Sequence, residues 1–89
     1  MFFRHLYSLN LVNGKGQTTK KLYCIPEGLE NFIMSRDYKQ DSLFLTHWAA
    51  DRKKELLKIL GKNKGIFTLC CWDIETGNMI AGSDYIVLN

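Results

Sequence analysis

Apolar and polar residues alternate along the first part of the chain, and this period of two is the pattern of β-strands. Residues 2–12 and 18–25 are the two predicted strands, and the segment 13–16, "NGKG", between them contains residues that tolerate positive φ, as hairpin turns require. Loops of two, three or four residues can all be built from this segment, so the register of the hairpin stays open. In the first strand, apolar residues dominate one face and polar residues the other: Phe3, His5, Tyr7, Leu9 and Leu11 against Arg4, Ser8 and Asn10.

The middle of the chain changes to a helical period. Pro26 suits the first position of a short helix that we expect to end near Ser35. A second, longer helix should end at Leu60, because Gly61 follows it as a C-cap residue. The start of this helix is open between Ser42 and Thr46, both of which can cap a helix.

The last part of the chain returns to strands. Residues 65–75 begin with apolar side chains on both faces, which favours a central strand. A turn containing Gly77 leads into a final strand over 79–88, in which Gly82 is a candidate bulge. The order ββααββ predicts an α+β fold over residues 1–89 as a single domain, with a four-stranded, mainly antiparallel sheet and one short and one long helix packed on one face.

The long helix has two predicted sides. Lys54, Lys58 and Lys62 repeat every four residues and form a basic ridge on the side turned to water. The opposite, apolar arc contains Arg52, which must snorkel, pair with a carboxylate or contact a partner, because burying an unpaired guanidinium is costly. The residues of this arc that we expect to face the core are Leu45, Trp48, Ala49, Leu56, Ile59 and Leu60. The candidate carboxylates for Arg52 are Asp84, Asp73 and Glu30.

Charge gathers in the same helix. The segment 47–64 carries six of the 12 Lys and Arg residues of a chain whose net charge is +3. Asp51 and Glu55 lie within reach of the ridge and dilute it. A solvated helix face and a contact with a polyanion or an acidic protein both fit this pattern, and Lys20 and Lys21 add no patch because they lie on opposite faces of their strand.

Composition places the chain among intracellular proteins. The three cysteines, Cys24, Cys70 and Cys71, are an odd number in apolar surroundings, which predicts small buried side chains in a reducing cytosol. No apolar run reaches the roughly 20 residues that span a bilayer. We interpret the N-terminus as mature protein and expect a cytoplasmic location without a membrane partner.

Catalytic and metal-binding patterns are weak in the sequence. His5 and His47 have no Cys, Asp or Glu at ligand spacing, so zinc bound with Cys24 and Cys70 has no support. Neither a phosphate-binding glycine loop nor a nucleophile elbow is present. We therefore expect a protein without cofactor, metal or catalytic activity.

These patterns predict a small non-catalytic interaction domain that acts as an intracellular regulator or inhibitor by binding another protein. The alternative is a nucleic-acid-binding module that uses the basic helix 47–64, and a more distant one is a small metal-independent ribonuclease based on His47. Self-association through a sheet edge is a further route to binding. The expected partner-binding residues are Trp48, Arg52, Lys54, Lys58, Lys62 and Lys64.

Overall fold

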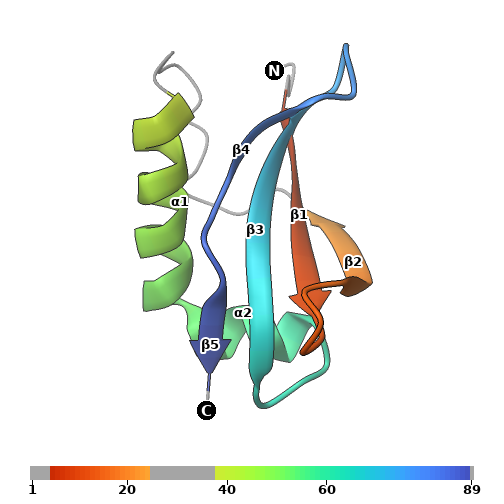
Figure 1. Ribbon diagram of the computed structural model, residues 1–89, viewed down its shortest axis with the longest axis vertical. Helices are drawn as coiled ribbons and strands as arrows, with labels where there is room; N and C mark the ends of the chain where they lie inside the picture. The colour runs from red at the N-terminus through yellow and green to blue at the C-terminus, as the bar shows by residue number, and fades with distance from the viewer. Residues whose placement is uncertain (1–4, 25–37, 89) are drawn as a thin grey trace.

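A hairpin opens the chain in the computed structural model, which describes residues 5–24 and 38–88 (Figure 1). Strands β1 (His5–Val12) and β2 (Thr18–Cys24) pair antiparallel with Leu9 opposite Leu22. The Asn13 side chain accepts hydrogen bonds from the backbone N–H groups of Lys15 and Gln17, and Gly16 supplies the positive φ of 78°. The predicted hairpin is confirmed, and residues 14–16 form its loop.

Strand β3 (Gly65–Asp73) lies at the centre of an antiparallel sheet with the order β2-β1-β3-β4. It pairs with β1 on one side, and on the other with both β4 (Met79–Gly82) and β5 (Ile86–Leu88). The α+β class and the succession of two strands, two helices and further strands in an antiparallel sheet are confirmed, as is the turn at Gly77, whose φ is +72°.

The last predicted strand is interrupted, so the sheet has five strands where the sequence predicted four. Ser83 causes the interruption: its hydroxyl accepts a hydrogen bond from the Leu69 N–H, and its own N–H donates to the Leu69 carbonyl. The register irregularity in β4 lies at Ile80, which faces no partner between Met79 and Ala81, and not at Gly82.

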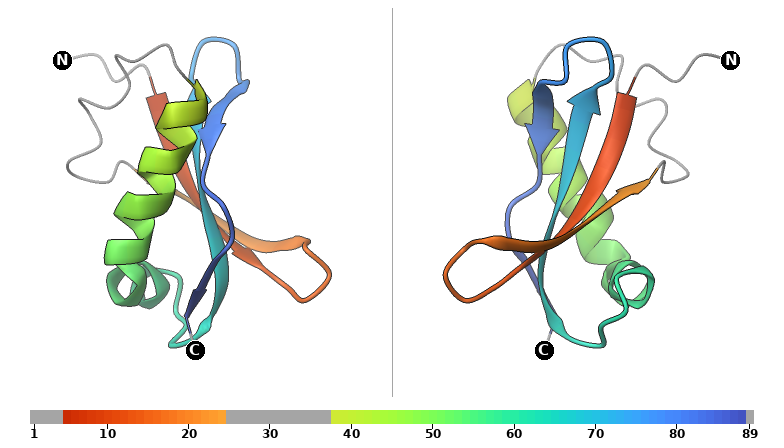
Figure 2. Two further views of the ribbon diagram at one scale, coloured as in Figure 1. Left: turned by 60° about the vertical axis from the view of Figure 1, so that its left-hand side comes forward. Right: turned by 90° about the vertical axis from the view of Figure 1, so that its right-hand side faces the viewer.

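Two helices follow the hairpin in the described part of the chain: α1 (Tyr38–Asp51) and α2 (Lys53–Ile59). Helix α1 begins before both Ser42 and Thr46, so both expected starts are wrong. The single long helix is broken at Arg52, whose φ of −122° and ψ of 24° are not helical. The axis of α2 then turns away from that of α1 (Figures 1 and 2). No described helix is long and apolar enough to span a membrane.

The expected end of the helical segment is confirmed. Gly61 has a φ of +77° and donates its N–H to the Lys58 carbonyl, while the Lys62 N–H reaches the Leu57 carbonyl. The short helix expected over 26–35 lies outside the described residues.

Both helices pack on one face of the sheet, as expected (Figure 2). The break at Arg52 rotates the buried side of α2 relative to that of α1, so Leu57 is fully buried and Ile59 is 56% exposed. The placement of Ile59 in the core was therefore wrong. The core consists of Tyr7, Leu9, Leu45, Trp48, Ala49, Leu56, Leu57, Leu60, Phe67, Leu69, Cys71, Ala81 and Ile86.

Helix α1 also covers the edge of the sheet formed by the last strands. The hydroxyl of Ser42 accepts a hydrogen bond from the Gly82 N–H at 3.3 Å, and that of Thr46 accepts one from the Asp84 N–H at 2.9 Å. Ser42 and Thr46 are one helical turn apart, so a single side of α1 binds both backbone groups. The opposite edge of the sheet is β2.

Candidate functional site

The sheet has a second face, turned away from the helices, which we call the outer face. Side chains opposite one another in an antiparallel pair share a face, and the pairs Asn10–Thr68, Ser8–Tyr23 and Trp72–Met79 place their members here. The outer face carries Ser8, Asn10, Lys21, Tyr23, Thr68, Cys70, Trp72, Met79, Tyr85 and Val87.

Buried polar groups form the centre of the outer face. Ser8 is fully buried, and its hydroxyl accepts a 2.8 Å hydrogen bond from the Trp72 indole N–H. The Asn10 side-chain amide donates to the Thr68 hydroxyl and to the Cys70 sulfur, both at 3.2 Å. The carbonyl oxygen of that amide is buried and accepts no hydrogen bond from the described residues. These contacts from β1 hold Thr68, Cys70 and Trp72 of β3 in fixed positions.

A lysine lies among the aromatic residues of this face. The Lys21 ammonium is 4.1 Å from the centroid of the Trp72 ring and 5.1 Å from that of the Tyr23 ring. Both distances are within the range of cation–π attraction. Lys21 therefore joins β2 to β3 across β1, and its charge is held over the sheet.

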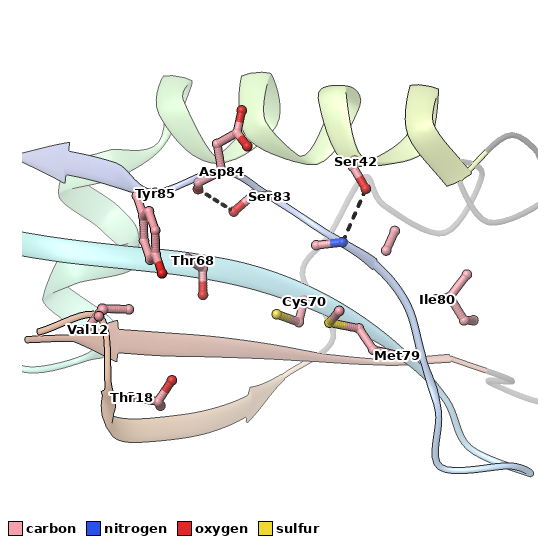
Figure 3. Close-up of a pocket in the computed structure, with 13 residues that line it drawn as sticks. Val12, Thr18, Ser42, Thr68, Cys70, Met79, Ile80, Ser83, Asp84 and Tyr85 are labelled. Atoms are coloured by element: carbon pink, nitrogen blue, oxygen red, sulfur yellow. Dashed lines mark hydrogen bonds between the residues drawn. The ribbon is translucent and has the colours of Figure 1, made fainter.

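A groove runs along the outer face between the β1–β2 hairpin and the chain from Met79 to Tyr85 (Figure 3). Its volume is about 780 Å³, and Thr68 and Cys70 form its floor. Tyr85 stands at one end, where it also borders a smaller hollow of about 220 Å³ against the hairpin turn. The volume of the groove lies within the range of natural binding pockets.

Large apolar side chains on the outer face are exposed to solvent, and two of them, Met79 and Tyr85, line the groove. Tyr85 is 62% exposed, although it belongs to the stretch that leads into the sheet. Tyrosine, tryptophan and methionine are enriched at protein interfaces. The exposed large apolar residues of the outer face are Tyr23, Met79, Tyr85 and Val87.

Trp48 and Arg52 form a pair at the junction of the two helices, whereas the four expected lysines lie on α2 and the loop after it. Trp48 is 9% exposed and belongs to the core. Arg52 lies against it: the guanidinium is 4.4 Å from the Trp48 ring centroid and donates a 3.1 Å hydrogen bond to the Trp48 carbonyl. Within residues 5–24 and 38–88, Arg52 forms no ion pair with Asp73 or Asp84. This geometry gives Arg52 a structural role at the break between the helices.

The four expected lysines are exposed and lie together on α2 and the loop after it. Lys20 joins them from β2, because its ammonium donates a 2.9 Å hydrogen bond to the carbonyl of Leu60 at the end of α2. Asp51 and Glu55 form no ion pair with these lysines among the described residues. We call this group the basic end: Lys20, Lys54, Lys58, Lys62 and Lys64.

Within residues 5–24 and 38–88, the side chains that could take part in catalysis or bind a metal lie apart from one another. No three His, Cys, Asp or Glu side chains there are close enough to hold a metal ion. His47 is exposed on α1, Cys71 is buried on the helix-covered face, and Cys70 is half-buried in the groove. Cys70 and Cys71 thus point to opposite faces, as expected of neighbours in a strand.

The aromatic residues of the outer face were not identified from the sequence. Lys21 and Tyr23 share a parity in β2, as do Thr68, Cys70 and Trp72 in β3. The sequence shows that residues two apart in one strand share a face. Only the pairing register between the strands shows that β2 and β3 present these residues on the same face of the sheet.

Comparison of the chain with protein-family models, with curated proteins and with solved structures finds no match. Its function is therefore argued from its own residues.

Proposed function

We propose that this chain is a small non-catalytic interaction domain that acts inside the cell by binding another protein through the outer face of its sheet. The observation that carries this proposal is the exposure of Tyr23, Met79, Tyr85 and Val87 on one face of the sheet, where Met79 and Tyr85 also line a groove. Apolar side chains gathered on one face are typical of surfaces that a partner covers. The helices already cover the other face, so the fold itself does not need these side chains for its core.

The polar floor of the groove favours a specific contact with one partner over non-specific hydrophobic binding. Asn10 holds Thr68 and Cys70 in place, and Trp72 is held by Ser8 and Lys21. Side chains that are fixed before binding lose little conformational entropy when a partner arrives. A domain of this size acts as a regulator or inhibitor by covering a surface of its partner.

The experiment is a pull-down from a nuclease-treated native lysate of the source cells with the wild-type chain and with two double variants. The test variant is Tyr23→Ser with Tyr85→Ser, both on the outer face. The control is Leu43→Ser with Ile59→Ser, which removes exposed apolar side chains from the helices. We expect the partner to be kept by the control and lost by the test variant. Equal retention by both variants, or loss of every partner after nuclease treatment, contradicts the proposal.

A second candidate is nucleic-acid binding through the basic end. The observation that favours it is Lys20, which adds a fifth cation to the four on α2 and its following loop. Contacts with phosphates give a logarithmic affinity that falls with the logarithm of salt concentration, by about 0.9 per phosphate on duplex DNA. Binding of a 20-base-pair DNA duplex that weakens with this slope, and that is lost in Lys54→Ala/Lys58→Ala/Lys62→Ala, supports this candidate. No measurable binding at low salt excludes it for duplex DNA.

A further inference from the structure

The two edges of the sheet differ in what covers their backbone groups. An uncovered edge presents N–H and C=O groups that can pair with another chain. At the edge formed by the last strands, the N–H groups of Gly82 and Asp84 donate to Ser42 and Thr46 of α1. A strand added at this edge would have to displace the helix.

Strand β2 forms the other edge, and β1 is the strand with which it pairs. The hairpin projects from the body of the molecule (Figure 2), and no described helix lies along the outer side of β2. Residues 18–21 and Tyr23 are exposed. Among the described residues, β2 is therefore the edge at which a partner can add a strand by main-chain hydrogen bonds.

The positive charge of the hairpin favours an added strand that carries negative charge. The first 26 residues contain no Asp or Glu, whereas Lys15, Lys20 and Lys21 lie in the described hairpin. Lys20 is on the helix side of β2 and Lys21 on the outer face, where its ammonium group reaches across β1 to Trp72, so each face of the sheet next to this edge carries a positive charge. Both ammonium groups are held in place, one by the Leu60 carbonyl and the other by the Trp72 ring.

We infer that β2 receives an acidic, extended segment of the partner protein, which adds to the sheet as a further strand. This inference rests on the proposed function, and it names the part of the partner that binds. An added strand presents alternate side chains to the two faces, so consecutive acidic residues in it lie one on the same face of the sheet as Lys20 and one on the same face as Lys21. A second copy of this chain would instead bring lysines next to lysines, which disfavours self-pairing at this edge.

The test uses three synthetic peptides with the sequence of residues 18–24, blocked at both ends and with serine in place of the cysteine. One carries glutamate in place of both lysines, one carries glutamine, and one keeps the lysines and so stands for a second copy of the strand. Binding to the full chain is measured by NMR titration at low salt, and the site is located by amide hydrogen exchange. We expect the glutamate peptide to bind at least about tenfold more tightly than the lysine peptide and to slow exchange in β2 but not in β4.

Charge reversal in the protein gives the matched control. Lys21→Glu, alone and with Lys20→Glu, should move the preference toward the lysine peptide, whereas Lys62→Glu/Lys64→Glu should leave it unchanged although the net charge falls equally in the two double variants. Lys21→Glu alone keeps the bond from Lys20 to Leu60, so the test does not depend on losing that contact.

Four results overturn the inference: no binding of the glutamate peptide, equal binding of the three peptides, exchange protection outside β2, or tighter binding of the lysine peptide to the wild-type chain. The pull-down of the cellular partner tests this inference separately from the proposed function. If the pull-down partner is lost with Tyr23→Ser/Tyr85→Ser but kept with Lys20→Glu/Lys21→Glu, an acidic strand at β2 is excluded while the proposed function stands.

Discussion

The ammonium group of Lys20, on the edge strand β2, donates a 2.9 Å hydrogen bond to the carbonyl oxygen of Leu60 at the end of α2. The last carbonyl groups of a helix have no partner within the helix, and a cation there also interacts favourably with the helix dipole. This one contact ties the hairpin to the helices and brings a lysine of the sheet to the basic end.

Replacing Lys20 by methionine should lower the free energy of unfolding by about 1 kcal/mol, because the helix end loses a charged donor. Lys62→Met is the control, since Lys62 is an exposed lysine of the same region and should change stability by less than about 0.5 kcal/mol. Urea denaturation measures the free energy of unfolding of both variants, provided that the m-value is the same as that of the wild type. Equal losses would show that the contact contributes nothing specific.

The hydroxyls of Ser42 and Thr46 should stabilise the edge formed by the last strands. Ser42→Ala and Thr46→Val should each cost about 1 kcal/mol, because each leaves a strand N–H without its acceptor. Amide hydrogen exchange should become faster at Gly82 in the first variant and at Asp84 in the second. His47→Ala, an exposed change on the same helix, should alter neither rate. Unchanged exchange at both amides would contradict the role of α1 in covering this edge.

The break at Arg52 predicts effects of different size at two nearby positions of α2. Leu57→Ala should destabilise the fold by about 3 kcal/mol, because Leu57 is completely buried. Ile59→Ala should cost less than about 1 kcal/mol, because more than half of that side chain is exposed. Thermal or urea unfolding of the two variants checks this directly. An uninterrupted helix, with Ile59 in the core, would reverse the order.

The attraction between Lys21 and Trp72 should be measurable as a coupling energy. A double-mutant cycle with Lys21→Met and Trp72→Leu should give about 0.5–1 kcal/mol, the range for cation–π pairs. The same cycle with Lys15→Met in place of Lys21→Met should give none, because Lys15 lies in the hairpin turn. A coupling of zero in the first cycle would mean that the ring does not hold the Lys21 charge in solution.

Local patterns were sufficient for much of the fold. The alternation in β1, the glycine turns at Gly16 and Gly77 and the C-cap at Gly61 all depend on a few consecutive residues, and the structure confirms them. The break at Arg52 was missed because the segment contains neither Gly nor Pro. It accompanies a rotation of the buried side between α1 and α2, which depends on where the sheet lies beneath each helix.

Less of the candidate site than of the fold could be predicted from the sequence. The sequence correctly predicted that Lys54, Lys58 and Lys62 are exposed, but only Lys54 and Lys58 share a helix face, because α2 ends at Ile59 and Lys62 lies in the loop after Gly61. It placed Trp48 and Arg52 on one arc, but it did not show that Arg52 stacks on a buried Trp48 at a break in the helix or that Lys20 joins the basic end. The burial of Trp48 and the contact of Lys20 depend on packing between elements, which single-sequence periodicity does not contain.

The sequence by itself determined the α+β class, the succession of strand and helix segments, and which side chains share a face within the uninterrupted strands, because these follow from the local period of the chain. Tertiary structure alone decided which faces meet. It brought Tyr23, Trp72 and Tyr85 to one side of the sheet, buried Ser8 and Asn10 beneath them, and left β2 at an edge. The physical reason is that register, strand order and helix docking are set by packing and hydrogen bonds between residues far apart in the chain, and the proposed binding surface consists of such residues.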